Sequence, residues 1–182
     1  MKSLRRFEVW IPCVTEVLSA TIGGSRQAAS DVDTPCEYPV RIAGKTILRR
    51  SPEELWDLLM NPIVLHRCIP GCERVEADGL HSFRLNLRLG MGLLKGRFRG
   101  VVRMLDVQRP ESYRMVVEAT GRTGSIFGEN IVRLLPLEGG GTEVAYSGTG
   151  KVQGGVALFG GARLDSALRE FSEKFFRTLA TL

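Results

Sequence analysis

SPEELWDLLMNPIVLHRCIPGCE, residues 51–73, decides the fold of this chain. Ser51 is a favourable helix N-cap, Pro52 suits the first helical turn, and Glu54 follows the serine at the spacing of a capping box. The leucines and the tryptophan that come next supply an apolar face. We therefore predict a short amphipathic helix that begins directly after Ser51.

A second short helix follows the first one. Asn61-Pro62 breaks the first helix and starts the next, which ends before the corner at Pro70-Gly71. An extended segment that begins at Val40 precedes the pair, and strands and one long helix come after it. This order of elements predicts a curved antiparallel sheet that grips a helix, with a cavity between them.

Alternation of apolar and polar residues marks the strands that follow the two helices. It is strictest at residues 83–89, where Arg84, Asn86 and Arg88 share one face and apolar residues share the other. Similar alternation recurs near residues 97–104, 113–119, 126–134 and 143–148, separated by short turn signals such as Arg109-Pro110. Short links of this kind predict an antiparallel meander of five or six strands.

The apolar face of such a sheet needs a partner, and the last segment of the chain supplies it. Apolar residues recur there at helical spacing, namely Leu164, Leu168, Phe171, Phe175 and Leu179. The glycine-rich run at residues 153–161 lacks the Gly-Lys-Ser/Thr ending of a phosphate-binding loop. We interpret it as a loosely specified first turn of this helix, which serves either as a lid at a pocket mouth or as a close-packing contact.

Residues 61–73 fit the pattern N-P-x-x-L-x-x-C-I-P-G-C-E, which resembles the signature of the family of carbon monoxide dehydrogenase G subunits. The resemblance continues through residues 95–100, 109–113 and 141–144 to the start of the last helix, and it covers roughly residues 40–182. That family lies within the START/Bet v1-like (SRPBCC, helix-grip) superfamily. The resemblance implies an α+β fold with a curved antiparallel sheet around a long C-terminal helix and an internal apolar cavity.

Composition and charge narrow the possible partners. The chain is 43% hydrophobic and 25% charged, as soluble globular proteins are, and no stretch approaches the ~18 uninterrupted apolar residues of a membrane span. Residues 1–39 carry a formal charge of −1 and the remainder +6. A basic domain favours an anionic partner, which is a lipid headgroup, nucleic acid or an acidic protein.

Cysteine and histidine usage argues against a metal site or a catalytic centre. Four cysteines are too few for a disulfide scaffold of this size, and we expect them to be reduced. Cys68 and Cys72 flank the Pro-Gly corner, and the two histidines, His66 and His81, lack the spacing of zinc ligands and the context of a general base. We therefore predict no metal, no cofactor and no catalytic residue.

Residues 1–39 show no sustained periodicity, and the resemblance begins only at about Val40. Glu8, Pro12 and Glu16 interrupt the apolar stretch that a signal peptide would need. We treat residues 1–39 as an N-terminal extension, either disordered or a wrongly assigned start with translation beginning at Val40. Residues 40–182 are the predicted ligand-binding domain.

Inward-facing residues are the candidates for lining the cavity. Asn130 is the one inward polar residue in an otherwise apolar row, and its buried amide must find a partner in backbone, water or ligand. Tyr113 and Tyr146 each carry a polar tip on an apolar body. The predicted lining set, to be either pocket wall or plain core, comprises Leu58, Leu65, Leu87, Leu89, Met91, Phe98, Tyr113, Met115, Ile126, Asn130, Tyr146, Leu158, Phe159, Leu164 and Leu168.

The opposite face of the sheet is rich in arginine. Seven outward arginines on adjacent strands are more than solubility requires: Arg84, Arg88, Arg97, Arg99, Arg103, Arg114 and Arg133. We expect a continuous basic face that docks on a membrane surface or on an acidic protein. Nucleic acid is disfavoured, because the aromatic residues point inward and do not interleave with the arginines.

Together these features predict a non-catalytic binding protein for a hydrophobic small molecule that is lipid- or quinone-like. The resemblance implies an accessory role, in assembly or membrane recruitment, for a molybdenum-containing dehydrogenase of the carbon monoxide/xanthine type. Some members of that family carry a hydrophobic tail, whereas this sequence ends at Leu182 on the helix. We expect a cytoplasmic protein with reversible, peripheral contact at the inner membrane face.

Two other functions stay open at this point. The first is an enzyme of the same superfamily, such as a cyclase, dehydratase or hydrolase that acts on an apolar substrate. The second is a protein-interaction module with a solid core and no ligand.

Overall fold

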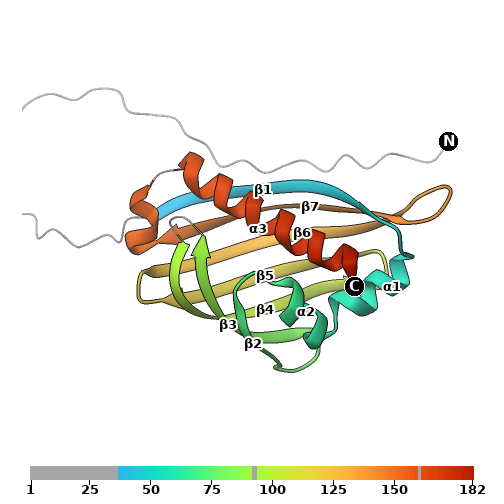
Figure 1. The fold of residues 1–182 in the computed structure, drawn as a ribbon, viewed down its shortest axis with the longest axis horizontal. Coiled ribbons are helices and arrows are strands. Elements are labelled where there is room, and N and C mark those ends of the chain that lie inside the picture. The colour runs from blue at the N-terminus through green and yellow to red at the C-terminus, as the bar shows by residue number, and fades with distance from the viewer. Residues whose placement is uncertain (1–36, 92–93, 160) are drawn as a thin grey trace, which may run out of the picture. The chain divides into compact units, whose positions relative to one another are not determined.

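The computed structural model describes residues 37–91, 94–159 and 161–182 (Figure 1). Its elements are, in chain order, β1 (Glu37–Leu48), α1 (Pro52–Leu59), α2 (Pro62–Cys68), β2 (Cys72–Ala77), β3 (Ser82–Met91), β4 (Leu94–Gln108), β5 (Ser112–Gly121), β6 (Gly124–Pro136), β7 (Thr142–Gln153), the 3-10 helix η1 (Gly154–Phe159) and α3 (Gly161–Thr181).

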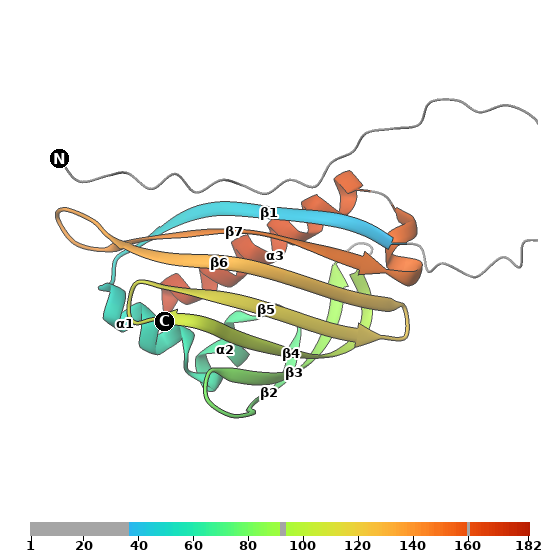
Figure 2. The same ribbon diagram turned by 180° about the vertical axis from the view of Figure 1, so that it is seen from behind.

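The described strands form one antiparallel sheet of seven strands in the order β1-β7-β6-β5-β4-β3-β2. β2 to β7 are neighbours in sequence and in space, and β1 pairs with β7 from Glu37 opposite Gln153 to Leu48 opposite Thr142. α3 crosses one face of the sheet in Figure 1, and Figure 2 shows the strands from the side away from this helix. The predicted fold class, a curved antiparallel sheet gripping a C-terminal helix, is confirmed.

The two short helices after the first strand are confirmed as well. The backbone N–H of Glu54 donates to Ser51 Oγ at 3.2 Å, and the N–H of Ser51 donates to Glu54 Oε2 at 3.0 Å, which completes the capping box. Asn61 caps α2, because its Oδ1 accepts a hydrogen bond from the N–H of Ile63 at 2.9 Å. Each helix therefore begins where its cap residue predicts.

The Pro-Gly corner after α2 is held against the sheet. Gly71 has a φ of +71°, which favours glycine, and its carbonyl accepts a hydrogen bond from the N–H of Arg88 at 2.7 Å. A Cβ added at Gly71 would collide with the carbonyl oxygen of Arg88. The corner thus fixes α2 relative to β3, and with it one wall of the interior.

Two elements differ from the sequence-based expectation. β2 was not predicted, because it is rich in charged residues and has little buried surface. Among the described strands it lies at the edge of the sheet and pairs with β3 alone. Most of the glycine-rich run at residues 153–161 does not belong to the last helix, which begins at Gly161. It forms the separate η1, which begins at Gly154 with a φ of +84°.

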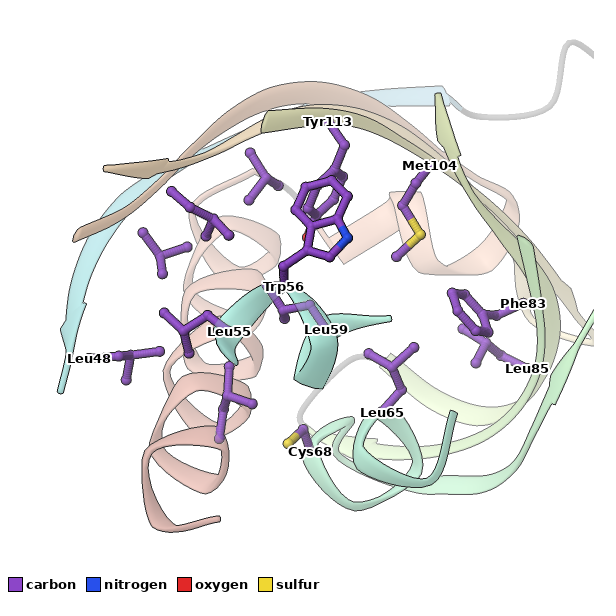
Figure 3. Packing of buried hydrophobic residues seen from close by; sticks show 14 residues of the cluster. Leu48, Leu55, Trp56, Leu59, Leu65, Cys68, Phe83, Leu85, Met104 and Tyr113 are labelled. Carbon is purple, nitrogen blue, oxygen red and sulfur yellow. The ribbon is translucent and has the colours of Figure 1, made fainter. Parts of the chain in front are cut away.

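Buried side chains form two clusters on the inner face of the sheet. In the larger one, Leu55 and Leu179 are 0% exposed and Trp56 is 3% exposed, and burial of such a side chain stabilises the fold by about 1.5–3 kcal/mol. Figure 3 shows its labelled members pointing from α1, α2 and the strands into a common interior. The smaller cluster contains Leu164 and Ala167 of the first half of α3.

Candidate functional site

The larger cluster does not fill its interior, and a cavity of about 220 Å³ remains between the inner face of the sheet, α2 and the second half of α3. This volume is somewhat below the ~300–1,000 Å³ typical of small-molecule sites, so it suits a compact ligand or part of an extended one. The wall is almost wholly apolar. Phe83, Leu85 and Met104 of the sheet face Leu59 and Leu65 of the short helices across this interior (Figure 3).

Six of the fifteen predicted lining residues line this cavity: Leu65, Leu87, Tyr113, Met115, Asn130 and Tyr146. Five others, Leu89, Phe98, Ile126, Leu164 and Leu168, belong to or pack against the smaller cluster, where the first half of α3 lies close to the sheet. Leu58 packs against the larger cluster without lining the cavity. The side chains of Met91, Leu158 and Phe159 lie outside the described part of the structure.

Other lining residues were not in the predicted set. On α3 they are Phe171, Ser172, Phe175 and Phe176, of which Phe171 and Phe175 belong to the predicted apolar stripe. The rest come from the helical corner and from the inward rows of the strands: Ile42, Leu59, Ile69, Phe83, Leu85, Val102, Met104, Val117, Val132 and Val144. Strand alternation identifies the side chains that face inward. It does not predict which of them contact α3 and which of them face the cavity.

Asn130 is the main polar feature of the cavity. Among the described side chains, its Oδ1 is the buried polar atom that has no hydrogen-bond partner. The amide lies over Gly148 on the neighbouring strand, where an added Cβ would collide with Asn130 Oδ1. An unmatched buried acceptor of this kind costs about 1–3 kcal/mol unless a donor meets it.

Two tyrosines and one serine complete the polar groups of the wall. Tyr146 lies over Gly44 of β1 and stacks on Phe176, with ring centroids 5.3 Å apart. Tyr113 contacts Trp56 edge to face at 5.6 Å, and burial raises the pKa of its phenol. The hydroxyl of Ser172 donates to the carbonyl of Leu168 at 3.1 Å, so its oxygen remains able to accept.

The lining of this cavity contains no Asp, Glu, His, Lys, Arg or Cys within the described residues. His66 is exposed on α2, and His81 lies in the connection between β2 and β3 with a φ of 57°. The same part of the chain holds no group of three His, Cys, Asp or Glu residues that could bind a metal ion. The cavity wall therefore offers hydrogen bonds and apolar contact, and a tyrosine phenol with a raised pKa is a poor general base at neutral pH.

Cys68 and Cys72 are free thiols at the corner after α2. Burial raises the pKa of both, and Cys72 Sγ lies 3.4 Å from the carbonyl oxygen of Arg74, to which it donates. Both side chains are therefore protonated at neutral pH and unreactive as nucleophiles.

The outward arginines are interleaved with carboxylates. Five of the seven form ion pairs: Arg84 with Asp78, Arg88 and Arg97 with Glu73, Arg103 with Glu118, and Arg114 with Asp106 and Glu129. For Arg99 and Arg133 no ion pair is found within the described residues. The face is thus mixed in charge, and its role in docking stays a prediction. No helix in the described segments has the length and apolar character to cross a membrane.

Solved structures share this fold. A conserved protein from Geobacillus kaustophilus is 27% identical, with a TM-score of 0.75 over 78% of this chain and 93% of that one. A START superfamily protein from Mycobacterium smegmatis is 10% identical, with a TM-score of 0.61 over 78% and 94%. The protein Mll3558 from Rhizobium loti is 15% identical, with a TM-score of 0.60 over 80% and 97%. The last two similarities concern the fold alone.

The chain thus shares the fold of a START superfamily protein, as predicted. A search of the curated proteins finds no match for this chain. The family model for the G subunit of carbon monoxide dehydrogenase (CoxG) matches residues 44–182, which is most of the sequence. The corner after α2, the strands β2 to β7 and the long C-terminal helix all lie within that match, and the chain belongs to the CoxG family.

Proposed function

We propose that this protein binds a hydrophobic small molecule, lipid- or quinone-like, in the cavity beneath α3 and does not convert it chemically. The observation that carries the proposal is the unpartnered Oδ1 of Asn130 in an almost wholly apolar cavity. The amide offers an acceptor in Oδ1 and donors in Nδ2, so it can meet either a hydroxyl or a carbonyl of a ligand. The surrounding leucine, valine and phenylalanine side chains would bind the apolar part.

The test is native mass spectrometry of the purified protein, followed by organic extraction of whatever is bound. We expect a bound mass that extracts as an acyl or isoprenoid species. A protein that is free of ligand and takes up neither added quinones nor lipids would contradict the proposal and favour an interaction module.

A matched pair of variants on β5 localises the binding. Val117 lines the cavity, whereas Val116, its neighbour on the strand, points to the opposite face of the sheet. Val117→Phe places extra volume in the cavity and should abolish the bound mass. Val116→Phe adds the same volume on the outer face and should leave the bound mass unchanged.

We propose further that the protein is an accessory factor for a molybdenum-containing dehydrogenase of the carbon monoxide/xanthine type, in assembly or membrane recruitment. Membership of the CoxG family supports this role. Arg99 and Arg133, for which no ion pair is found within the described residues, are the outward arginines best able to contact an acidic partner.

Replacing Arg99 and Arg133 together by glutamate tests this role. The double variant should weaken binding to the purified dehydrogenase, or to vesicles that contain anionic lipid, without changing the bound mass. Unchanged binding to both would remove the arginine face from the proposal. Turnover of the bound molecule by the wild-type protein alone would establish the enzyme alternative instead.

A further inference from the structure

A second hollow lies where α2 and α3 pack together, and we call this boundary between the two helices the seam. The hollow is lined by residues 66–72, which are the end of α2 and the Pro-Gly corner, and by Lys174, Arg177 and Thr178 of α3. We name this hollow the basic cleft, because Arg67, Lys174 and Arg177 line it and no carboxylate does so within the described residues.

The basic cleft and the apolar cavity meet at this seam. Ile69 lines both of them. On α2, Leu65 lines the cavity while the next two residues, His66 and Arg67, line the cleft. A molecule that passes Ile69 would therefore leave an apolar wall and enter a cationic one.

The same change of character occurs along one turn of α3. Phe175 and Phe176 line the cavity, whereas Lys174 and Arg177, which flank them in sequence, line the cleft. Successive residues of a helix point in directions about one hundred degrees apart, so a single turn presents apolar rings to one space and cations to the other. Where α2 and α3 meet, the side that faces the cavity is thus apolar and the side that faces the solvent is cationic.

The three cations of the cleft differ in the contacts that they make within the described residues. Lys174 Nζ lies 2.6 Å from Glu170 Oε1, an ion pair within one helix. Arg67 stands in the last turn of α2, where a cation stabilises the helix dipole, but the last turn of α3 contains no basic residue, so Arg177 has no such role. Neither Arg67 nor Arg177 forms an ion pair with a carboxylate of the described residues.

We propose that the ligand is an amphiphile with an anionic head, whose carboxylate or phosphate lies in the basic cleft and whose chain occupies the cavity and presents a hydroxyl or carbonyl to Asn130. The guanidinium groups of Arg67 and Arg177 provide the head with paired N–H donors in the geometry that such anions accept. This inference rests on the proposed function and narrows its ligand class, because a neutral ligand would leave the basic cleft without a role.

The experiment compares ligands that differ only in the head. A long-chain hydroxy fatty acid, its methyl ester and the hydroxyalkyl phosphate of equal chain length are titrated into the delipidated full-length protein, and inorganic phosphate is titrated separately. We expect the acid and the hydroxyalkyl phosphate to bind ~10-fold or more tighter than the ester, since a charge-assisted contact is worth about that factor. Inorganic phosphate alone should bind far more weakly than either.

Arg67→Gln and Arg177→Gln test the head group site. Each should reduce the preference for the acid over the ester while the affinity for the ester stays unchanged. Arg169→Gln is the matched control, because Arg169 is exposed on the same helix but does not line the cleft. Thermal unfolding of all three variants checks that each is folded.

The outcomes separate this inference from the function on which it rests. Equal affinity for acid and ester, an equal effect of Arg169→Gln, or tight binding of inorganic phosphate alone would each overturn the anionic-head assignment while leaving a cavity ligand in place. No binding of any chain, or binding that Val117→Phe does not affect, would overturn the proposed function itself.

Discussion

At the scale of single residues, glycines decide where the polar side chains of the cavity lie. Asn130 extends over Gly148 and Tyr146 over Gly44, each on the neighbouring strand and each where a Cβ would collide with the polar tip. The two side chains therefore lie flat against the sheet and leave the cavity open. The polar groups of Asn130 and Tyr146 can orient a ligand by hydrogen bonding while they occupy little of the cavity volume.

Asn130→Leu should raise stability and lower affinity at the same time. The substitution removes an unmatched buried acceptor with little change of volume, so the free energy of unfolding of the ligand-free protein should rise by about 1 kcal/mol. Binding of a ligand with a hydroxyl or carbonyl should weaken. Urea unfolding and ligand titration measure the two effects, with Asn86→Leu on the outer face as control. A large loss of stability would mean that the amide has a structural partner.

Gly71→Ala should destabilise the protein by about 2 kcal/mol or more. A left-handed backbone costs a non-glycine residue roughly 1–2 kcal/mol, and here the added Cβ also meets the carbonyl oxygen of Arg88. Gly79→Ala separates the two causes, because Gly79 has a φ of +105° but nothing within 4 Å of an added Cβ. Chemical denaturation of both variants should rank Gly71→Ala as clearly the more damaging.

At the scale of elements, α3 changes its relation to the sheet along its length. Leu164 and Ala167 in its first half are buried in the smaller cluster, so this half packs closely on the strands. The second half carries Phe171, Phe175 and Phe176, whose rings line the cavity and do not close it. α1 and α2 cover the open end, and their position depends on the caps and on the corner at Gly71.

Ser51→Ala should lower the free energy of unfolding by about 1 kcal/mol, because the N–H of Glu54 loses its acceptor and α1 loses its cap. Glu54→Gln is the control, since a glutamine can still accept from the N–H of Ser51. Equilibrium unfolding by urea measures both. A loss for Glu54→Gln with none for Ser51→Ala would show that the charge of Glu54, and not the Ser51 cap, stabilises this end of the helix.

At the scale of the whole molecule, the first strand of the described residues extends the sheet by pairing with the last. β1 begins at Glu37, three residues before the domain boundary at Val40 predicted from the sequence. Glu37 Oε1 lies 3.0 Å from Lys151 Nζ, and its Oε2 accepts a hydrogen bond from Gln153 Nε2 at 2.7 Å, which lowers the pKa of Glu37. The folded domain therefore includes these three residues, whereas the predictions for residues 1–36 fall outside the described residues.

A chain of residues 37–182 should be more stable than one of residues 40–182. The shorter fragment loses the strand pairs of Glu37, Tyr38 and Pro39 with β7, and Tyr38 also packs against the smaller cluster. We expect a lower midpoint of thermal unfolding for the shorter fragment, with the bound ligand retained in both. Equal midpoints would place the true boundary at Val40.

The sequence by itself determined where the short helices begin and which residues lie on each face of the sheet. Ser51, Glu54 and Asn61 fixed where the short helices begin, because caps are contacts between near neighbours, and strict alternation separated Leu85 and Leu87 from Arg84 and Arg88. The resemblance in residues 61–73 identified the family. The edge strand β2 was missed, since a strand with little buried surface has almost no apolar periodicity.

Only the tertiary structure decided which inward residues surround empty space. Leu89 and Met115 have the same alternation, yet Leu89 is core beneath the first half of α3 and Met115 lines the cavity beneath the second. The physical reason is that the distance between helix and sheet depends on all the side chains between them, from residues far apart in sequence. The basic cleft has the same origin, because Arg67 and Arg177 line one hollow only when α2 packs beside α3.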